Sequence, residues 1–404
     1  MSNTFRRVAA LGAATILLTS ACSSDGDGGG AAEDKITVGI SLPLTGDFSE
    51  PGKGVQQGYQ AWAKIVNDKG GLLGRQVELK ILDDQSNADR VVADYEQLIG
   101  KDQVDLVVGP FSTRLVVPAA RVAEEYDMLF VEPAGAAKAV FEQGFKNLFY
   151  AAPAVANDHY NHLAEAILAM PADQRPKTVA VASMDDPFAQ GTAYGLRDKL
   201  KAGGLTIVAD EVYPPNTTDF NQIAAKIAAT KADVLIGGSQ YQDGVNLIVA
   251  LQQLRYQPKL AAFSTAPTEP EFAKAIGNKT EGVLSPTGYS QDAPYPSNKE
   301  FVEKYKAQFG RDPEEDQANA YTTGQVVEAA VKAANCAEQG ECQKKLVDFV
   351  RKNKIETVVG PLTWDATGKP QGAHMIQQWV GGEIKIVFPK ETKETEFVYP
   401  KPAW

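Results

Sequence analysis

The segment Gly109-Pro110-Phe111-Ser112-Thr113 is the part of this sequence best suited to binding an anion. It follows a short apolar run and precedes a predicted helix, so its backbone N–H groups and two hydroxyls lie at a helix N-terminus. Free N–H groups and the helix dipole both favour a negative charge there, such as a carboxylate. The alternative is that Ser112 only caps its helix, as serine often does. Composition alone does not separate these two interpretations.

Aromatic residues stand at the ends of several other predicted elements. They are Phe48, Phe111, Phe188, Tyr241 and Tyr289. Each one alone is typical of ordinary packing at an element boundary. Together they indicate an apolar pocket for a ligand side chain, and they favour a hydrophobic or aromatic small acid over a sugar.

The sequence offers little for catalysis. It contains no Gly-x-Ser-x-Gly elbow and only three histidines, His159, His162 and His374, so a Ser-His-Asp arrangement is hard to place. The spacing of His159 and His162 beside Asp158 could hold a metal, although such a pair is more often a solvated helix turn. We therefore expect no enzyme activity, no cofactor and no metal, and an exported hydrolase is the weaker alternative.

The N-terminus has the pattern of an export signal. Arg6 and Arg7 precede an apolar run over residues 8–18, which is too short to cross a bilayer because a spanning helix needs about 20 apolar residues. The small residues that end at Cys22 resemble a lipobox, in which cleavage before the cysteine leaves its thiol for lipidation. The alternative is an ordinary secretory signal with an incidental cysteine.

Two N-terminal segments follow from this pattern. We expect residues 1–21 to be a lipoprotein signal peptide. Residues 22–34 are mostly Ser, Gly, Ala and Asp and offer no large side chain for a core, so they are predicted to form a flexible tether.

The charge of the chain is acidic. The formal net charge is -11, and loss of the two arginines with the signal peptide lowers it by two further units. Such a surface disfavours nucleic acid as a partner.

Cys336 and Cys342 are the remaining cysteines and flank a polar loop that contains Gly340. In an exported protein this arrangement indicates a small disulfide clamp, and a pair of free thiols is the alternative.

From residue 35 onward, short β-rich runs alternate with amphipathic stretches, the pattern of βα units that build parallel sheets. The body is longer than one hydrophobic core usually spans, so two lobes are expected. The predicted strands are 35–42, 76–82, 104–108 and 128–131, then 178–182, 206–212, 234–236, 260–263 and 282–286. The predicted helices include 55–68, one that Asn87 caps, 219–230, 243–254, 297–309 and 316–334. The last two follow each other directly, which indicates a return to the first lobe.

Several motifs occur in a recognisable order. They are Pro43-Leu44-Thr45-Gly46, the glycine-containing turn at 67–74, Val108-Gly109-Pro110, Val131-Glu132-Pro133-Ala134 and the segment 356–365. In order and spacing these motifs resemble the branched-chain amino acid (Leu/Ile/Val) binding proteins, which are type I periplasmic substrate-binding proteins of ABC importers, over residues 35 to about 388. The resemblance implies an α/β Venus flytrap, with two doubly wound Rossmann-like lobes joined by three crossover strands. The expected lobes are 35–153 with 285–372, and 154–284 with 373–404.

The resemblance also implies a ligand site. The position of Thr113 contacts the ligand carboxylate, and that of Ala134 offers a backbone carbonyl to an amino group. The position of Ala136 usually carries a hydroxyl, which is missing here. An aromatic ring at Phe188 covers the ligand, and Ser239 contributes from the second lobe. Ser112, Phe111 and Tyr241 complete the expected contacts beside these positions.

One family position is occupied unexpectedly. Amino acid binders place an acid there to pair with the ligand ammonium, whereas this chain has Thr265. A buried cation without an acid partner is unfavourable. Either an acid elsewhere supplies the charge, or the ligand carries no ammonium group. The candidate acids are Glu132, Asp158, Asp185 and Asp186.

The expected function is that of an extracytoplasmic, lipid-anchored binding protein. It would capture a hydrophobic amino acid or an aromatic or aliphatic carboxylate and deliver it to the permease and ATPase subunits of an ABC importer. A ligand sensor that presents its bound state to a receptor is the alternative, and no feature within the chain separates the two.

Overall fold

A computed structural model of the chain describes residues 35–269, 271–277 and 279–404. The expected signal peptide, Cys22 and the tether lie outside the described residues. Two main β-sheets organise the described part, and we call each sheet with its covering helices a lobe.

Lobe 1 is built on a five-stranded parallel sheet with the order β2-β1-β3-β4-β5. Its strands are β1 (Lys35–Leu42), β2 (Gln76–Asp83), β3 (Leu106–Val108), β4 (Phe130–Glu132) and β5 (Leu148–Tyr150). Consecutive residues of β3 point to opposite faces of the sheet, since Val108 belongs to one hydrophobic cluster and Val107 to the other. A sheet buried on both faces in this way is the doubly wound arrangement.

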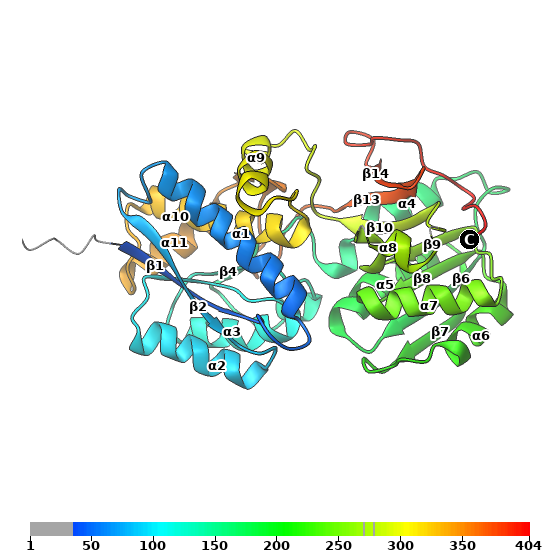
Figure 1. Cartoon of the computed structure of the whole chain (residues 1–404), viewed down its shortest axis with the longest axis horizontal. Coiled ribbons are helices and arrows are strands. Elements are labelled where there is room, and N and C mark those ends of the chain that lie inside the picture. Colours follow the sequence, from blue (N-terminus) through cyan, green and yellow to red (C-terminus); the bar gives the residue numbers. More distant parts are fainter. Residues whose placement is uncertain (1–34, 270, 278) are drawn as a thin grey trace, which may run out of the picture. The chain divides into compact units, whose positions relative to one another are not determined.

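Helices cover both faces of the lobe 1 sheet (Figure 1). One face packs against α1 (Ser49–Asp68), α9 (Asn298–Phe309), α10 (Glu315–Ala334) and α11 (Glu341–Lys352). The other face packs against α2 (Ala88–Glu96) and α3 (Thr113–Glu125). The late helices therefore pack on the same sheet as α1.

Lobe 2 is built on a seven-stranded sheet with the order β14-β13-β10-β9-β8-β6-β7. Its strands are β6 (Thr178–Met184), β7 (Thr206–Tyr213), β8 (Val234–Gly238), β9 (Leu260–Phe263), β10 (Val283–Thr287), β13 (Met375–Val380) and β14 (Glu383–Phe388). Strands β6 to β10 are parallel, and β13 and β14 add antiparallel at the edge.

Helices also cover both faces of the lobe 2 sheet. One face packs against α4 (Asn161–Leu168) and α5 (Pro187–Ala202). The other face packs against α6 (Asn221–Thr230), α7 (Tyr241–Gln253) and α8 (Phe272–Ala275). The α/β fold with two doubly wound lobes is therefore confirmed.

The chain passes between the lobes three times, and the three crossing segments lie against one another. The N–H of Gly372 in the third crossing donates to the carbonyl of Pro153 in the first, at 2.9 Å. Gly288 in the second crossing also lies against Pro153, because a Cβ at Gly288 would be 3.1 Å from the proline ring. A larger residue at Gly288 would therefore crowd the junction.

Two element boundaries differ from the predicted ones. Helix α1 begins at Ser49 rather than residue 55, and its first turns include glycines that pack closely on neighbouring segments. Strand β10 continues to Thr287, so the lobe 2 sheet extends past the boundary expected after residue 284. No helix in the described residues is long and apolar enough to cross a membrane.

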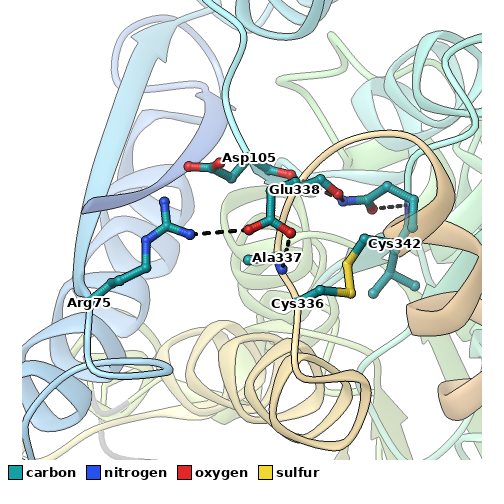
Figure 2. Close-up of a disulfide and its surroundings, with 8 residues drawn as sticks. Arg75, Asp105, Cys336, Ala337, Glu338 and Cys342 are labelled. Carbon is teal, nitrogen blue, oxygen red and sulfur yellow. Dashed lines mark hydrogen bonds and ion pairs between the residues drawn. A yellow bond between two sulfur atoms is a disulfide. The ribbon is translucent and has the colours of Figure 1, made fainter. Parts of the chain in front are cut away.

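A disulfide joins Cys336 and Cys342, whose Cα atoms are 6.0 Å apart. Figure 2 shows this loop beside Arg75, whose guanidinium lies 3.4 Å from the carboxylate of Glu338. The side-chain amide of Gln339 donates to the carbonyl of Val104 at 2.8 Å. The clamp therefore holds the connection between α10 and α11 against the amino-terminal part of lobe 1.

Replacement of both cysteines by serine should lower the free energy of unfolding of lobe 1. A loop of this length removes about 2 kcal/mol of chain entropy from the unfolded state. Urea unfolding with and without dithiothreitol would measure the effect. The reductant should destabilise the wild type and leave the double variant unchanged, and equal stability of oxidised wild type and double variant would contradict this role.

Candidate ligand-binding site

The strand order places the predicted site at equivalent points of the two lobes. Strands β2-β1-β3-β4-β5 and β7-β6-β8-β9-β10 follow the same order, which reverses direction beside β1 in lobe 1 and beside β6 in lobe 2. In such sheets ligands bind in the crevice outside the carboxyl ends of the strands at this reversal. Thr113 and Phe188 lie at the starts of the helices that follow β3 and β6, and Ser239 lies in the loop after β8.

The loop after β3 presents a buried hydroxyl at the start of a helix. Ser112 occupies the N-cap position of α3 in extended conformation, but its side chain makes no capping hydrogen bond. Thr113 is the first residue of α3 and is 8% exposed, and its Oγ1 has no hydrogen-bond partner among the described residues. The interpretation of Ser112 as only a side-chain cap is therefore not supported, and both hydroxyls remain available to a ligand.

Glu132 lies directly behind this loop, at the end of β4. It is fully buried, and its Oε2 accepts hydrogen bonds from the N–H groups of Ala134 (2.7 Å) and Gly135 (2.5 Å). Its Oε1 has no hydrogen-bond partner in the described part of the chain. Burial raises the pKa of Glu132 to about 8, and the two backbone donors only partly offset that effect.

The two small residues of this turn have different surroundings. Ala134 is half-buried, whereas Ala136 is buried and its carbonyl accepts a hydrogen bond from Ala156 N at 2.8 Å. Ala136 thus ties the end of lobe 1 to the segment that enters lobe 2. It offers a ligand no hydroxyl, and its carbonyl oxygen already accepts one hydrogen bond.

Lobe 2 contributes a second buried hydroxyl. Ser239 follows β8 and is fully buried, and its Oγ has no hydrogen-bond partner among the residues that the structure describes. Ser264 fixes its backbone, because the Ser264 hydroxyl bonds both the N–H (2.8 Å) and the carbonyl (2.6 Å) of Ser239. Thr265 is half-buried at the start of a 3-10 turn. Tyr241 begins α7 and packs against the lobe 2 core.

The predicted aromatic residues do not form one group. Phe48 and Phe111 pack edge to face with ring centroids 5.9 Å apart. Phe188 packs against a lobe 1 cluster and against His159, at 5.9 Å. Tyr289 is buried in the other lobe 1 core. Phe111 and Phe188 therefore stay candidates for ligand contact, whereas the surroundings of Tyr289 indicate core packing.

Three of the four candidate acids are paired or exposed. Asp158 lies 3.0 Å from the Lys369 ammonium, and Asp185 is exposed. Asp186 caps α5 and pairs with Arg114. Of the four candidate acids, Glu132 alone is both buried and without a basic side chain paired with it among the described residues.

Sequence reasoning missed a cluster at the crossing segments. The rings of His159 and His374 stack with centroids 3.8 Å apart, and His374 Nε2 lies 3.3 Å from a carboxylate oxygen of Glu315. Burial, and then the neighbouring His374, hold the pKa of His159 well below its usual range. Because His159 stacks on His374, a metal site shared by His159 and His162 is not supported.

Further acids gather beside this cluster. Burial, together with Glu314 and Glu271, raises the pKa of Glu269 to about 7. Burial and the neighbouring Glu315 raise that of Asp316 as well. Glu269 comes from lobe 2 and Asp316 from α10 of lobe 1, so no sequence-local pattern indicated their proximity.

A surface hollow of about 360 Å³ borders the predicted site without containing it. Thr113 and Arg114 line it together with other residues of α3, and Pro187 lines it from lobe 2. Ser112, Ala134, Phe188 and Ser239 do not line this hollow. We base the site on the strand ends and the buried hydroxyls, because the hollow is open and follows the outer flank of α3.

Comparison with known proteins gives a consistent picture. The periplasmic binding protein family model matches residues 35–383. The Leu/Ile/Val-binding protein BraC3 of Rhizobium johnstonii is 26% identical over 87% of this chain and 94% of its own length.

Solved structures share the fold at low sequence identity. A solute-binding protein of an ABC transporter from R. palustris in complex with benzoate is 18% identical, with a TM-score of 0.75 over 92% of this chain and 98% of that one. A branched-chain amino acid transporter substrate-binding protein from Streptococcus pneumoniae in complex with isoleucine is 20% identical, with a TM-score of 0.72 over 91% and 100%.

Members of this family are binding proteins of transporters rather than enzymes, and the family indicates an extracytoplasmic location. The match spans both lobes and all three crossings. The chain belongs to the periplasmic binding protein family.

Proposed function

We propose that the chain is a substrate-binding lipoprotein of an ABC importer, which captures a small hydrophobic amino acid or a related aromatic or aliphatic carboxylate and delivers it to the permease. The observation that carries the proposal is the buried Thr113 hydroxyl at the start of α3, which has no partner within the described residues. Buried polar groups normally have a partner, so a ligand carboxylate is a natural acceptor for this donor. Lipid attachment at Cys22 is part of the proposal and rests on the sequence pattern alone.

The ligands named for similar proteins share one chemistry. Leucine, isoleucine, valine and benzoate each carry a carboxylate on a compact apolar body. In this chain Thr113 and the N-terminus of α3 are suited to the carboxylate. Phe111 lies two residues before Thr113, and Phe188 packs against a lobe 1 cluster, so both are candidates for the apolar surface around the ligand body.

The proposed mechanism is closure of the lobes around the ligand. The carboxylate docks on the α3 start of lobe 1, and the loops that carry Phe188 and Ser239 in lobe 2 then complete its enclosure. Closure requires that the ligand bind the closed state more tightly than the open one. The closed form is the one that a permease would recognise.

Thr113→Val should weaken binding of the ligand about tenfold or more, because it deletes a hydroxyl that donates to a charged group and keeps the side-chain volume. Thr322→Val is the matched control, since Thr322 is a buried threonine of lobe 1 whose hydroxyl also has no partner among the described residues. Isothermal titration calorimetry would measure both. Unchanged affinity of the Thr113 variant would show that the carboxylate binds elsewhere.

A thermal-shift comparison of benzoate with L-leucine tests the ligand class. We expect benzoate to raise the Tm more, because Thr265 stands where amino acid binders place an acid and burial of Glu132 favours its neutral form. A larger shift with L-leucine would mean that one of the buried acids pairs with the ammonium. The absence of any shift with both compounds would remove the proposed ligand class.

The stability of the protein should depend on Glu132 in a defined pH window. Its pKa is raised from the usual carboxyl range to about 8 on folding, so the folded state holds a proton that the unfolded state loses. Its contribution is therefore fully present below about pH 4.5 and is lost as the pH rises through 8, by on the order of 4 kcal/mol.

Urea unfolding of the wild type and of Glu132→Gln at several pH values would measure this effect. The glutamine does not titrate, so the variant should gain stability relative to the wild type from pH 5 to pH 9. Glu96→Gln, at an exposed position of α2, should leave the pH profile unchanged. Parallel profiles for Glu132→Gln and the wild type would contradict the raised pKa.

A further inference from the structure

We propose that Arg114 and Asp186 form a latch between the lobes that favours the closed state and slows release of the ligand. This inference rests on the proposed function for its role in ligand release. The guanidinium of Arg114 in α3 lies 3.4 Å from Asp186 Oδ2 at the start of α5. The two residues belong to helices on different sheets, so their contact requires the starts of α3 and α5 to be brought together.

Asp186 is fixed before it meets the arginine. Its Oδ1 accepts hydrogen bonds from the N–H groups of Phe188 (3.0 Å) and Ala189 (3.1 Å), so this carboxylate oxygen caps α5. Pro187 at the first helical position further restricts the backbone. Only the arginine side chain therefore loses freedom when the pair forms, which removes part of the entropy cost that weakens most surface ion pairs.

The exposure of the two partners differs. The Asp186 side chain is 10% exposed, whereas that of Arg114 is 46% exposed. The arginine can therefore rotate into water when the lobes separate, while the carboxylate keeps its two backbone donors. Both states of the latch are thus compatible with an intact α5 cap, as a reversible contact requires.

The latch is coupled to the proposed ligand contacts by covalent proximity. Arg114 directly follows Thr113, and Asp186 precedes Phe188 by two residues. When the ion pair forms, the segments that carry Thr113 and Phe188 are therefore close to each other. A ligand held by both segments stabilises the ion pair, and the ion pair in turn raises the population of the ligand-binding state.

Other ion pairs that join the lobes lie at the crossing segments. Among the described residues, Asp158 pairs with Lys369, and His374 Nε2 lies 3.3 Å from a Glu315 carboxylate oxygen, and these residues lie at or beside the crossing segments. Arg114 and Asp186 instead join the two candidate binding loops. Because of this position, we infer that the pair forms when the lobes close, whereas the contacts at the crossing segments do not depend on closure.

The test uses the full chain with Arg114→Gln, Asp186→Asn and the double variant. Asparagine caps helices as well as aspartate does, so Asp186→Asn removes the charge and keeps an acceptor for Phe188 N and Ala189 N. Small-angle X-ray scattering of the ligand-free proteins reports the closed population, and stopped-flow displacement of benzoate and of L-leucine reports the dissociation rate.

We expect each single variant to increase the radius of gyration of the ligand-free protein at low salt and to raise the dissociation rate about two- to fivefold. The double variant should behave like either single variant, because the interaction is lost once. At about 500 mM NaCl the wild type should approach the variants, since salt screens a partly exposed pair.

Arg121→Gln is the matched control. Arg121 lies on α3 beside the same surface hollow and carries the same charge. Its removal should leave both the scattering and the dissociation rate at wild-type values, and circular dichroism checks that every variant is folded.

The latch is refuted if the variants scatter and release probe like the wild type, or if the two single effects add in the double variant. Equal effects of Arg121→Gln would also overturn it, because they would indicate a general charge effect on α3. If neither benzoate nor L-leucine binds the wild type or the variants, the proposed ligand class fails. The latch still stands in that case if the variants have a larger radius of gyration than the wild type at low salt and the difference disappears at high salt.

Discussion

Parallel strands of one sheet all end at the same edge, and this constraint determines where the chain can bind a ligand. In each lobe the order of the strands reverses beside the first strand, and ligands of such sheets bind outside the strand ends at this reversal. The loops after β3, β6 and β8 reach these points for that reason. Because both sheets have this strand order, each lobe offers one such edge to a ligand.

Burial without partners gives these loops their chemical character. Thr113 and Ser239 each bury a hydroxyl that has no hydrogen-bond partner in the described part of the chain, and Glu132 buries a carboxyl group with one oxygen in the same condition. Such groups cost free energy in an isolated protein. A ligand carboxylate that accepts a hydrogen bond from Thr113 would recover part of that cost. The unpartnered hydroxyl would then both destabilise the ligand-free site and contribute to ligand affinity.

Much of this arrangement could be predicted from sequence, because strands and their terminal loops leave local signals. The run at 104–108, the loop at 109–113 and the cap at Asn87 all have counterparts in the structure. The start of α1 was missed because Gly52 and Gly54 look like helix breakers. The structure gives their reason, since a Cβ at Gly52 would clash with the Pro43 carbonyl and one at Gly54 would lie 2.8 Å from the Gln317 side-chain amide.

Contacts between the lobes could not be predicted in the same way. The stacking of His159 on His374 and the pairing of Arg114 with Asp186 join segments that are remote in sequence and have no shared motif. They depend on how the three crossings set one sheet against the other. The acids near the crossings belong to the same class, because only the folded chain shows that Glu269 influences a cluster at the start of α10.

A crystal structure of the full chain grown with benzoate would test the central claim most directly. The account predicts the carboxylate within hydrogen-bond distance of Thr113 Oγ1 and the first N–H groups of α3, with the ring enclosed by residues of both lobes. A carboxylate bound to the outer flank of α3, or to one lobe without contact to the other, would contradict it.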